Sequence, residues 1–528
     1  MASELPVGIV GGGPVGLITA LGLVRYGVPV VVFEEDGALS HDTKAGTTLT
    51  RTLEVLHRYG ALDDVLRQSV RIDEIGEVDR ATNAAKPGVE MGSLTEDTRF
   101  PFVVNVPQQA MEPALAGRLD ALSPGALRHE HRLTAFREEG DHVEITLQTP
   151  TGERTERVSY LLGCDGGRST VRRQLKIPAP GHTREERCAL VDVKVDLDVS
   201  NPRDYPYLAY FADPDEWMIL VRQPHCWRFV FPLAPGKPEP TVAELREKAT
   251  HFIGAVDELE VLGSNVYSVH HRVADRYRAG RAFLLGDAAH LITPMWALGL
   301  NTGVLDASNL PWRLAWVLRG WADDTLLDGY ETEQLPVALR GSGQMAQAAY
   351  EQMQKASAGG PVGAGTWGTA MTRGLLGVRL PVAEAGDVSI VRGGDAPRPL
   401  VAGDRLPDLP LFGDSGRTYL HDLAADSFVA LYFTDTRRGP EIPPQHSPAL
   451  RHYAVSRWDA PHDSGLRDRA LFDPADRVRR RLGITGDTLV LLRPDGHAAA
   501  VADWDAREQG VPLAVKLYRD VTGRYPVD

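Results

Sequence analysis

Glycines gather in one short segment near the N-terminus, directly after a run of β-branched residues. The run ends at Val10, and Gly11, Gly13 and Gly16 then open a helical pattern. In such a strand–turn–helix unit, the first glycine permits a tight turn, the second lets the backbone approach a pyrophosphate, and the third lets the helix pack on the strand. The free N–H groups where the helix starts, at Pro14, favour an anion. The segment therefore predicts a site for the phosphates of a dinucleotide.

A second apolar strand, residues 29–33, ends on two acidic residues. Glu34 stands near the position where an acidic side chain accepts hydrogen bonds from a ribose diol. Glu35 is the alternative, and we favour Glu34 because the strand ends directly on it. The βαβ unit alone does not distinguish FAD from NAD, so the later segments have to decide between them.

A polar turn follows a third predicted strand, residues 159–163. It holds Asp165 and Gly166, and Arg172 follows six residues after Gly166. An Asp-Gly pair at the end of a strand is an ordinary turn signal, and a capped turn with a surface arginine is one reading of it. The other reading is a phosphate contact, because a guanidinium offers two parallel donors.

A fourth predicted strand, residues 281–285, ends in Gly286 and Asp287 and begins the third candidate segment, and a helix is predicted to open at Asn301. A helix N-terminus stabilises negative charge nearby. Together, in this order and spacing, the three segments resemble those of the FAD-dependent aromatic hydroxylases, the single-component flavoprotein monooxygenases of the p-hydroxybenzoate hydroxylase type. The resemblance implies that Asp287 holds the flavin ribityl chain, and that Asp165 and Arg172 lie near the pyrophosphate and the path of the nicotinamide cofactor.

Two further segments support the resemblance. Lys44-Ala45-Gly46 is similar to the family's R-A-x-G stretch, with a lysine that keeps the charge and loses the fork of arginine. Gln108 begins a segment similar to the family's Q-x-x-L-E, which starts a helix beside the flavin. For both side chains an ordinary solvated surface position is the alternative.

The loop after the third segment departs from the family. The usual sequence is P-P-x-G-G-Q-G-x-N, and this chain keeps Pro294, Gly299 and Asn301, with Leu300 between the last two. The substituted positions carry Thr293, Trp296, Ala297 and Leu298. The resemblance places this loop along the flavin ring edge, so a bulky Trp296 there implies a reshaped active-site wall. Tryptophan lacks the backbone freedom of glycine, which leaves the loop geometry open.

Two strand-like runs, 217–222 and 227–233, flank a turn in the middle of the chain. Trp227, Phe229 and Phe231 alternate in the second run and therefore share one face. Such a stripe is more often plain core, although in the resembled family a sheet from this region covers the substrate pocket. The candidate substrate contacts are Tyr210, Arg222, His225, Trp227 and Trp296.

The whole chain of 528 residues predicts an α/β protein with three parts. We expect a Rossmann-like FAD-binding domain of the glutathione-reductase type over 1–180 and 266–355, interleaved with a mixed β-sheet substrate domain at 181–265. A linker or helical segment rich in Gly, Ala and Pro is expected at 356–400. The resemblance to phenol and phenylpropionate hydroxylases implies a thioredoxin-like domain at 401–528. No cysteine follows Cys226, so that domain lacks redox cysteines.

Composition narrows the remaining possibilities. A hydrophobic fraction of 43% and the lack of a long apolar run or signal peptide predict a cytoplasmic protein without a membrane segment. A net charge of −14 argues against nucleic acid as a partner. Three scattered cysteines and no ligand cluster predict neither disulfides nor a metal. We expect a monomer or a homodimer.

No side-chain nucleophile or paired acid stands out, which favours chemistry carried by a cofactor. The resemblance implies an FAD-dependent monooxygenase that uses NADPH or NADH and O2 to hydroxylate a phenolic or polycyclic aromatic substrate through a flavin C4a-hydroperoxide. Only one dinucleotide fingerprint is present, so the nicotinamide cofactor is a transient visitor. The alternatives are an FAD-dependent epoxidase, a Baeyer–Villiger monooxygenase or a non-oxygenating flavin oxidoreductase. An NAD dehydrogenase and a non-catalytic protein remain further rivals.

Overall fold

The computed structural model describes most of the chain. The described residues are 5–39, 46–79, 84–197, 205–212, 216–254, 256, 258–293, 297–357, 400–434, 447–457, 469–504 and 510–527. Lys44, Pro294 and Trp296 lie outside these ranges, and so does nearly all of the predicted linker at 356–400.

A six-stranded sheet forms the centre of the first domain. Its order is β18 (Arg278–Ala279), β19 (Ala282–Leu284), β12 (Leu161–Gly163), β1 (Val7–Val10), β2 (Val30–Phe33) and β8 (Leu127–Arg128). All neighbours pair in parallel except β18 with β19. The β-branched runs that predicted strands are fully buried, as expected for a parallel sheet covered on both faces. The three sequence segments with candidate site residues follow β1, β12 and β19, so they meet at one edge of this sheet.

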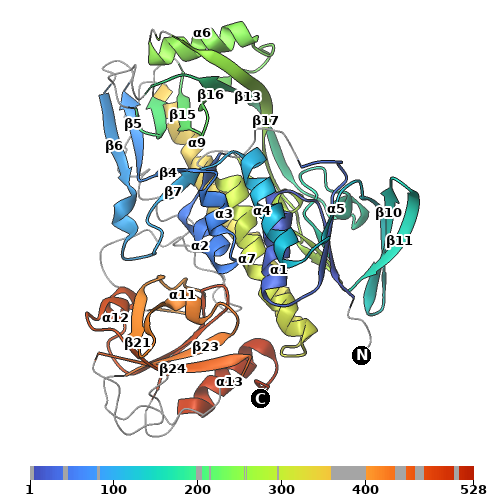
Figure 1. The fold of residues 1–528 in the computed structure, drawn as a ribbon, viewed down its shortest axis with the longest axis vertical. Helices are drawn as coiled ribbons and strands as arrows, with labels where there is room; N and C mark the ends of the chain where they lie inside the picture. Colours follow the sequence, from blue (N-terminus) through green and yellow to red (C-terminus); the bar gives the residue numbers. More distant parts are fainter. Residues whose placement is uncertain are drawn as a thin grey trace.

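Most of the helices of this domain are labelled in Figure 1. The domain contains α1 (Pro14–Arg25), α2 (Thr50–Arg58), α3 (Leu62–Leu66), α4 (Gln108–Leu122), α5 (Thr170–Gln174), α7 (Leu298–Leu318), α8 (Asp328–Pro336) and α9 (Gly343–Ser357). Short helical turns lie at η1 (Met91–Leu94), η2 (Gly286–Ala288), η4 (Asp324–Leu327) and η5 (Val337–Ser342). A small sheet of β9 (Arg132–Glu139), β10 (His142–Thr149) and β11 (Gly152–Val158) projects to one side. Helix α7 packs against α1, α2 and α8 and is buried along most of its length.

An eight-stranded sheet forms the second layer. Its order is β20 (His290–Leu291), β17 (Glu260–Val273), β13 (Gly181–Lys194), β16 (Trp227–Leu233), β15 (Met218–Arg222), β14 (Leu208–Ala212), β5 (Glu74–Asp79) and β6 (Ala84–Glu90). It therefore extends beyond the expected range 181–265 on both sides. The parallel pairing of β5 with β14 joins segments far apart in the sequence, which leaves no local signal. Helix α6 (Val242–Ile253) covers the outer face, and β3 (Thr47–Thr48), β7 (Val103–Asn105) and β4 (Val70–Ile72) form a small sheet beneath.

The C-terminal part is a separate α/β domain, drawn in orange and red in Figure 1. Its sheet has the order β22 (Gly416–Tyr419), β21 (Pro410–Gly413), β25 (Ala470–Phe472), β24 (Leu450–Ser456), β23 (Phe428–Phe433), β26 (Thr488–Leu492) and β27 (Ala498–Asp503). Its helices are α11 (Leu420–Leu423), α12 (Arg477–Leu482) and α13 (Gly510–Thr522). The strands expected from the sequence at 428–433 and 488–492 are confirmed, and the thioredoxin-like assignment stays a prediction.

The turn between β26 and β27 attaches this domain to the first one. The Asp495 carboxylate accepts hydrogen bonds from Trp312 Nε1 on α7 at 3.1 Å and from Arg493 Nε at 3.1 Å. The Asp495 carbonyl accepts from Arg51 at 2.7 Å and from Arg58 at 3.0 Å, both on α2. The turn that the sequence predicted from Pro-Asp-Gly is thus buried between two helices of the first domain.

Two buried glutamates complete this polar junction. Glu54 on α2 accepts hydrogen bonds from Arg51 and Thr98 at 2.8 Å and from Arg405 Nε at 3.0 Å. Burial alone would raise its pKa, but the neighbouring cations hold the pKa of Glu54 well below its usual range. Glu333 on α8 accepts hydrogen bonds from Arg493 at 2.6 and 2.9 Å. Burial raises its pKa, but Arg313 and Arg493 outweigh burial and lower the pKa of Glu333 to about 2. Because an unpaired buried charge is costly, the two domains depend on each other for these partners.

Two buried histidines lie in the same junction. His497 donates from Nδ1 to the Gly403 carbonyl at 3.1 Å, and its Nε2 accepts from Arg51 at 3.3 Å. Burial and the Arg51 charge lower the pKa of His497 to about 3. Burial likewise lowers the pKa of His421 to about 4. Both rings are therefore neutral in the folded protein at neutral pH.

Acid is expected to weaken this junction. An ordinary histidine has a pKa of 6.5, so between pH 6.5 and pH 4 the unfolded chain binds protons on His421 and His497 that the folded chain does not bind. The contribution of the two histidines to the free energy of unfolding is fully present above pH 6.5. It decreases as the pH falls, by roughly 1 kcal/mol per pH unit for each histidine. Thermal unfolding measured from pH 7.5 to pH 4.5 checks this.

The His497→Gln variant isolates one of the two rings. Glutamine can still accept from Arg51 and donate to Gly403, but it does not titrate. We expect its unfolding midpoint to fall less than that of the unmodified protein between pH 7.5 and pH 4.5. His225→Gln, at an exposed position, is the matched control. Equal acid sensitivity of His497→Gln and the unmodified protein would contradict the assignment.

Candidate cofactor site

The glycine loop between β1 and α1 leaves room only at its centre. A Cβ on Gly11, where φ is 105°, would lie 2.4 Å from the Cys164 carbonyl oxygen, and one on Gly16 would lie 2.1 Å from the Gly11 carbonyl oxygen. A Cβ on Gly13 would meet nothing closer than Glu112 Oε1 at 4.0 Å. The first and third glycines are thus required by packing, whereas the middle one faces space. Helix α1 has no side-chain cap, so its N–H groups can hold an anion there.

Glu34 lies across this loop. Its Oε2 accepts a hydrogen bond from the Gly12 N–H at 2.6 Å, and its Oε1 accepts from the Asp36 N–H at 3.0 Å. The carboxylate is therefore fixed beside the space in front of α1, where a ribose would follow the phosphates. Glu35 lines a neighbouring pocket, and Glu34 has the printed hydrogen bond to the loop.

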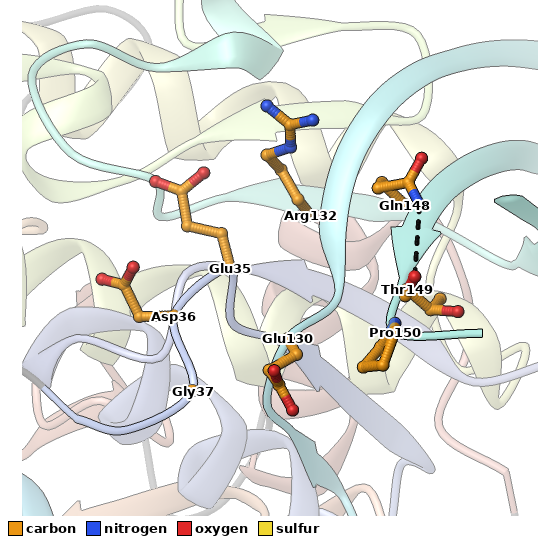
Figure 2. Close-up of a pocket in the computed structure, with 8 residues that line it drawn as sticks. All are labelled: Glu35, Asp36, Gly37, Glu130, Arg132, Gln148, Thr149 and Pro150. Carbon is orange, nitrogen blue, oxygen red and sulfur yellow. Dashed lines mark hydrogen bonds between the residues drawn. The ribbon is translucent and has the colours of Figure 1, made fainter. Parts of the chain in front are cut away.

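Glu35 lines a polar cavity of about 360 Å³ beside the loop after β2 (Figure 2). The other lining residues are Asp36, Gly37, Glu130, Arg132, Gln148, Thr149 and Pro150. The cavity adjoins Glu34, because Glu35 and Glu130 line it and the neighbours of these two residues are joined: the Glu34 carbonyl accepts the His131 N–H at 2.8 Å. Its walls carry carboxylates and one guanidinium and no aromatic side chain, so it does not suit an apolar ring.

The Asp-Gly turn after β12 packs directly against the glycine loop. Asp165 Oδ2 accepts from the N–H groups of Thr170 at 2.6 Å and Val171 at 3.1 Å, which caps α5. Its Oδ1 is buried and has no partner. A Cβ on Gly11 would lie 3.1 Å from the Asp165 Cα. An unsatisfied carboxylate oxygen beside the loop is consistent with a ligand at this place.

Arg172 does not present a free fork. Its Nη1 donates to the Ala288 carbonyl at 2.7 Å, and its Nη2 donates to the Gly167 carbonyl at 2.7 Å. The sequence pattern suggested a phosphate contact, but both terminal nitrogens already bind backbone carbonyls. Arg172 therefore holds the second segment to the third, which is a positioning role that no local pattern reveals.

The third segment exposes one acid among buried neighbours. Asp287 is exposed, whereas Gly286 and Ala288 are buried in the turn η2. Asp306 on α7 fixes this turn, because its Oδ2 accepts the Gly286 N–H at 2.9 Å and lies 2.8 Å from His290 Nε2. Burial lowers the pKa of His290, but Asp306 outweighs it and the net shift is upward. Asp306 and His290 are positioning residues that no local sequence pattern indicated.

Glycine permits α7 to approach α1 closely at this point. A Cβ on Gly303 would lie 2.7 Å from Val15 and 3.1 Å from the Gly286 Cα. A Cβ on Gly286, where φ is 58°, would lie 3.0 Å from Val15. The first and third segments therefore pack closely, because Val15 lies against Gly303 and Gly286 and leaves no room for a Cβ atom on either glycine.

Helix α7 begins earlier than the sequence predicted, at Leu298. Its N-cap, Ala297, has φ 56° and ψ 25°, the left-handed region in which glycine is the usual residue. In the resembled family this position is a glycine, so the chain keeps the conformation and changes the residue. Gly299 and the half-buried Leu300 follow in the first turn, whose N–H groups have no side-chain cap.

Asn301 has no free side-chain hydrogen-bonding group. Its Oδ1 accepts from the Leu49 N–H at 2.9 Å and from Thr52 Oγ1 at 2.6 Å. Its Nδ2 donates to the carbonyls of Thr47 at 3.1 Å and Ala297 at 2.7 Å. These bonds use the whole amide, so the predicted cofactor contact of this side chain is replaced by a structural role. Asn301 ties α7 to β3 and α2.

Gln108 lies near the glycine loop through its partner Glu112, and its place beside the flavin stays a prediction. It opens α4 and donates to Glu112 Oε1 at 2.6 Å. Glu112 is the side chain nearest to the open space at Gly13. The pair thus borders the expected phosphate site from a second helix.

The substrate candidates fall on different faces of the eight-stranded sheet. Tyr210 belongs to the core shared with the first domain, which is the inner face. Trp227, with Phe229 and Phe231, belongs to the core under α6, which is the outer face, so this aromatic stripe is plain core. His225 is exposed in the turn between β15 and β16.

Arg222 is also removed from the inner face. Its Nη1 donates to the carbonyls of Gln223 at 2.6 Å and Cys226 at 3.1 Å, so it closes the turn between β15 and β16. The alternation that turns Trp227 outward turns Arg228 inward. That signal was present in the sequence and was missed.

Two negative findings concern the described part of the chain. No group of histidines, cysteines, aspartates or glutamates in it could hold a metal ion. None of its helices is long and apolar enough to cross a membrane.

Comparison with known proteins identifies close similarities. The family model described as "FAD binding domain" matches residues 4–341. The chain is 31% identical to 12-dehydrotetracycline 5-monooxygenase/anhydrotetracycline 6-monooxygenase of Streptomyces rimosus, over 97% of this chain and 98% of the relative. It is 29% identical to para-nitrophenol 4-monooxygenase of Pseudomonas sp., over 66% of this chain and 87% of the relative. The crystal structure of aklavinone-11 hydroxylase with FAD and aklavinone superposes with a TM-score of 0.81 at 26% identity, covering 99% and 100% of the two chains.

The left-handed Ala297 predicts an unusual response to glycine. A left-handed residue other than glycine costs about 1–2 kcal/mol, so Ala297→Gly is expected to raise stability by up to ~1 kcal/mol once the entropy of glycine is subtracted. The same change at half-buried Ala116 inside α4 should lower stability by about 1 kcal/mol. Thermal unfolding of both variants with bound cofactor checks the contrast. A loss of stability in both would contradict the strained conformation.

Asp287 predicts the strength of cofactor binding. If its exposed carboxylate binds the ribityl chain, Asp287→Ala should weaken FAD binding about 10–100-fold, as expected for a lost hydrogen bond to a charged group, while the protein stays folded. Asp141→Ala, at an exposed position in the β9–β10 hairpin, is the control. Flavin content after purification and titration of the apoprotein measure the effect, and full flavin retention in Asp287→Ala would refute the role.

Proposed function

The chain belongs to the FAD-dependent aromatic hydroxylases, and we propose that it is a monooxygenase that adds one oxygen atom of O2 to a polycyclic aromatic substrate, with NADPH or NADH as the electron donor. The meeting of three separate segments around the glycine loop, the second against Gly11 and the third against Val15, carries the cofactor assignment. FAD, when bound there, supplies the oxygen-activating chemistry. The side chains of the protein contribute binding, orientation and exclusion of water.

The extent of the similarities supports a polycyclic substrate. The relative named for 12-dehydrotetracycline and anhydrotetracycline aligns with 97% of this chain, and the structure with bound aklavinone covers 99% of it. The relative named for para-nitrophenol, a single ring, aligns with 66% of this chain. The C-terminal domain is thus shared with the relatives named for large substrates.

The roles of individual residues follow from their places. We propose that Gly13 and the N-terminus of α1 bind the pyrophosphate, that Glu34 binds the ribose, and that Asp287 binds the ribityl chain. Asp165 Oδ1, buried without a partner, is the remaining acceptor beside the loop. The N-terminus of α7 would stabilise negative charge on the reduced ring.

We also propose a cytoplasmic location and a monomeric or homodimeric state. The three cysteines, Cys164, Cys188 and Cys226, are all free thiols, as expected in a reducing compartment.

Isotopically labelled O2 tests the reaction. The purified protein should be yellow, should oxidise NAD(P)H faster in the presence of hydroxylated anthraquinones or naphthols, and should yield a product with one labelled oxygen per molecule. NMR of the product then distinguishes ring hydroxylation from epoxidation or ring expansion. A product without the label would exclude every oxygenase, and a colourless protein would exclude the flavin.

A further inference from the structure

A buried ion pair crosses the inner face of the substrate sheet. Asp192 on β13 and Arg228 on β16 are directly opposite each other in the antiparallel register. Arg228 Nε donates to Asp192 Oδ1 at 2.8 Å, and Arg228 Nη2 donates to Asp192 Oδ2 at 3.0 Å. The two side chains are 3% and 9% exposed. The pairing uses the fork of the guanidinium and neutralises its charge.

Two polar atoms beside this pair have no partner. Arg228 Nη1 is buried and donates to nothing, and Gln223 Oε1 is buried and accepts nothing. Gln223 is 1% exposed, and its Nε2 lies 3.5 Å from the Gly46 carbonyl, which orients the oxygen away from that strand. Buried polar groups of this kind are nearly always satisfied in folded proteins. Arg228 Nη1 is therefore an available donor and Gln223 Oε1 an available acceptor for a bound molecule.

Gly46 and Thr47 lie between these two groups and the start of α7. A Cβ on Gly46 would be 2.8 Å from Gln223 Nε2 and 3.4 Å from Arg228 Nη1, so the strand passes close to them. The next residue, Thr47, accepts a hydrogen bond from Asn301 Nδ2 on α7 at 3.1 Å. Arg228 and Gln223 are thus separated from the first turn of α7 by a single strand, at the expected ring end of the flavin.

The surrounding inner face is apolar. Leu190, Leu208, Tyr210, Val221 and Val230 all belong to the core shared with the first domain. Apolar walls with a few polar groups are typical of a site for a flat ring system. The lone donor and acceptor would then set the orientation of the ring.

We propose that Arg228 and Gln223 determine substrate specificity by binding a neutral oxygenated ring, with a keto or phenolic oxygen accepting from Arg228 Nη1 and a hydroxyl donating to Gln223 Oε1. A carboxylate on the substrate is disfavoured, because Asp192 already occupies two donors of Arg228 and neutralises its positive charge. This inference rests on the proposed function and specifies its substrate class.

Three probes with one ring skeleton test the proposal on the FAD-loaded protein. They are 2,6-dihydroxyanthraquinone, whose hydroxyl groups lie too far from the keto groups for internal hydrogen bonds, anthraquinone, which lacks the hydroxyls, and anthraquinone-2-carboxylate. Binding is measured through the change in flavin absorbance during titration. We expect the dihydroxy probe to bind about tenfold more tightly than either of the others, which corresponds to one net hydrogen bond.

The variants separate the two groups. The double variant Arg228→Met/Asp192→Asn removes both charges together, so that no buried charge is left unpaired. It should bind the dihydroxy probe about tenfold more weakly and keep its FAD. Gln223→Leu should weaken the dihydroxy probe by a similar factor and leave anthraquinone unchanged. Arg246→Met, on the exposed side of α6, is the matched control and should change nothing.

The outcomes are distinct. Unchanged binding in both variants would overturn the inference and leave Arg228 and Gln223 as structural groups bridged by water. Tighter binding of the carboxylate probe, or no binding of any probe by the unmodified protein, would overturn the substrate class. A protein that fails to take up FAD, or whose flavin NAD(P)H does not reduce, would instead refute the proposed function itself.

Discussion

Helix α7 is buried along nearly its whole length, so the polar side chains on it depend on partners inside the protein. An unsatisfied buried polar group costs about 1–3 kcal/mol, so these partners are strongly specified. Asn301 binds β3 and α2, Asp306 binds the turn that carries Asp287, and Trp312 binds Asp495 of the C-terminal domain. The cofactor loop, the sheets and the C-terminal domain are therefore all placed by one helix.

This arrangement connects the C-terminal domain to the cofactor site through α2 and α7. Helix α2 carries Thr52, which binds Asn301 at the start of α7, and also Arg51 and Glu54, which bind the C-terminal domain. A displacement of that domain would leave the buried charge of Glu54 without Arg405. The domain therefore has a structural task that requires no thiol chemistry.

Hydrogen-bond partners also distinguish the roles of two arginines, Arg172 and Arg228. Arg172 uses both terminal nitrogens on backbone carbonyls and holds two loops together. Arg228 uses two nitrogens on Asp192 and leaves the third unsatisfied beside Gly46. A complete set of partners indicates a positioning residue, whereas an incomplete set on an inner face indicates a place for a ligand.

The sequence by itself determined the βαβ unit, the strands at 428–433 and 488–492, and the turn at Asp495, because strand periodicity and turn chemistry depend on residues close together in the chain. The order of the glycine and aspartate segments also determined the family. Only the tertiary structure decided which side chains were free. Asn301 and Arg172 looked available in the sequence, and their partners come from other segments of the fold. Arg228 gained its significance in the same way, since the face of a strand becomes inner or outer only when a second domain packs against it.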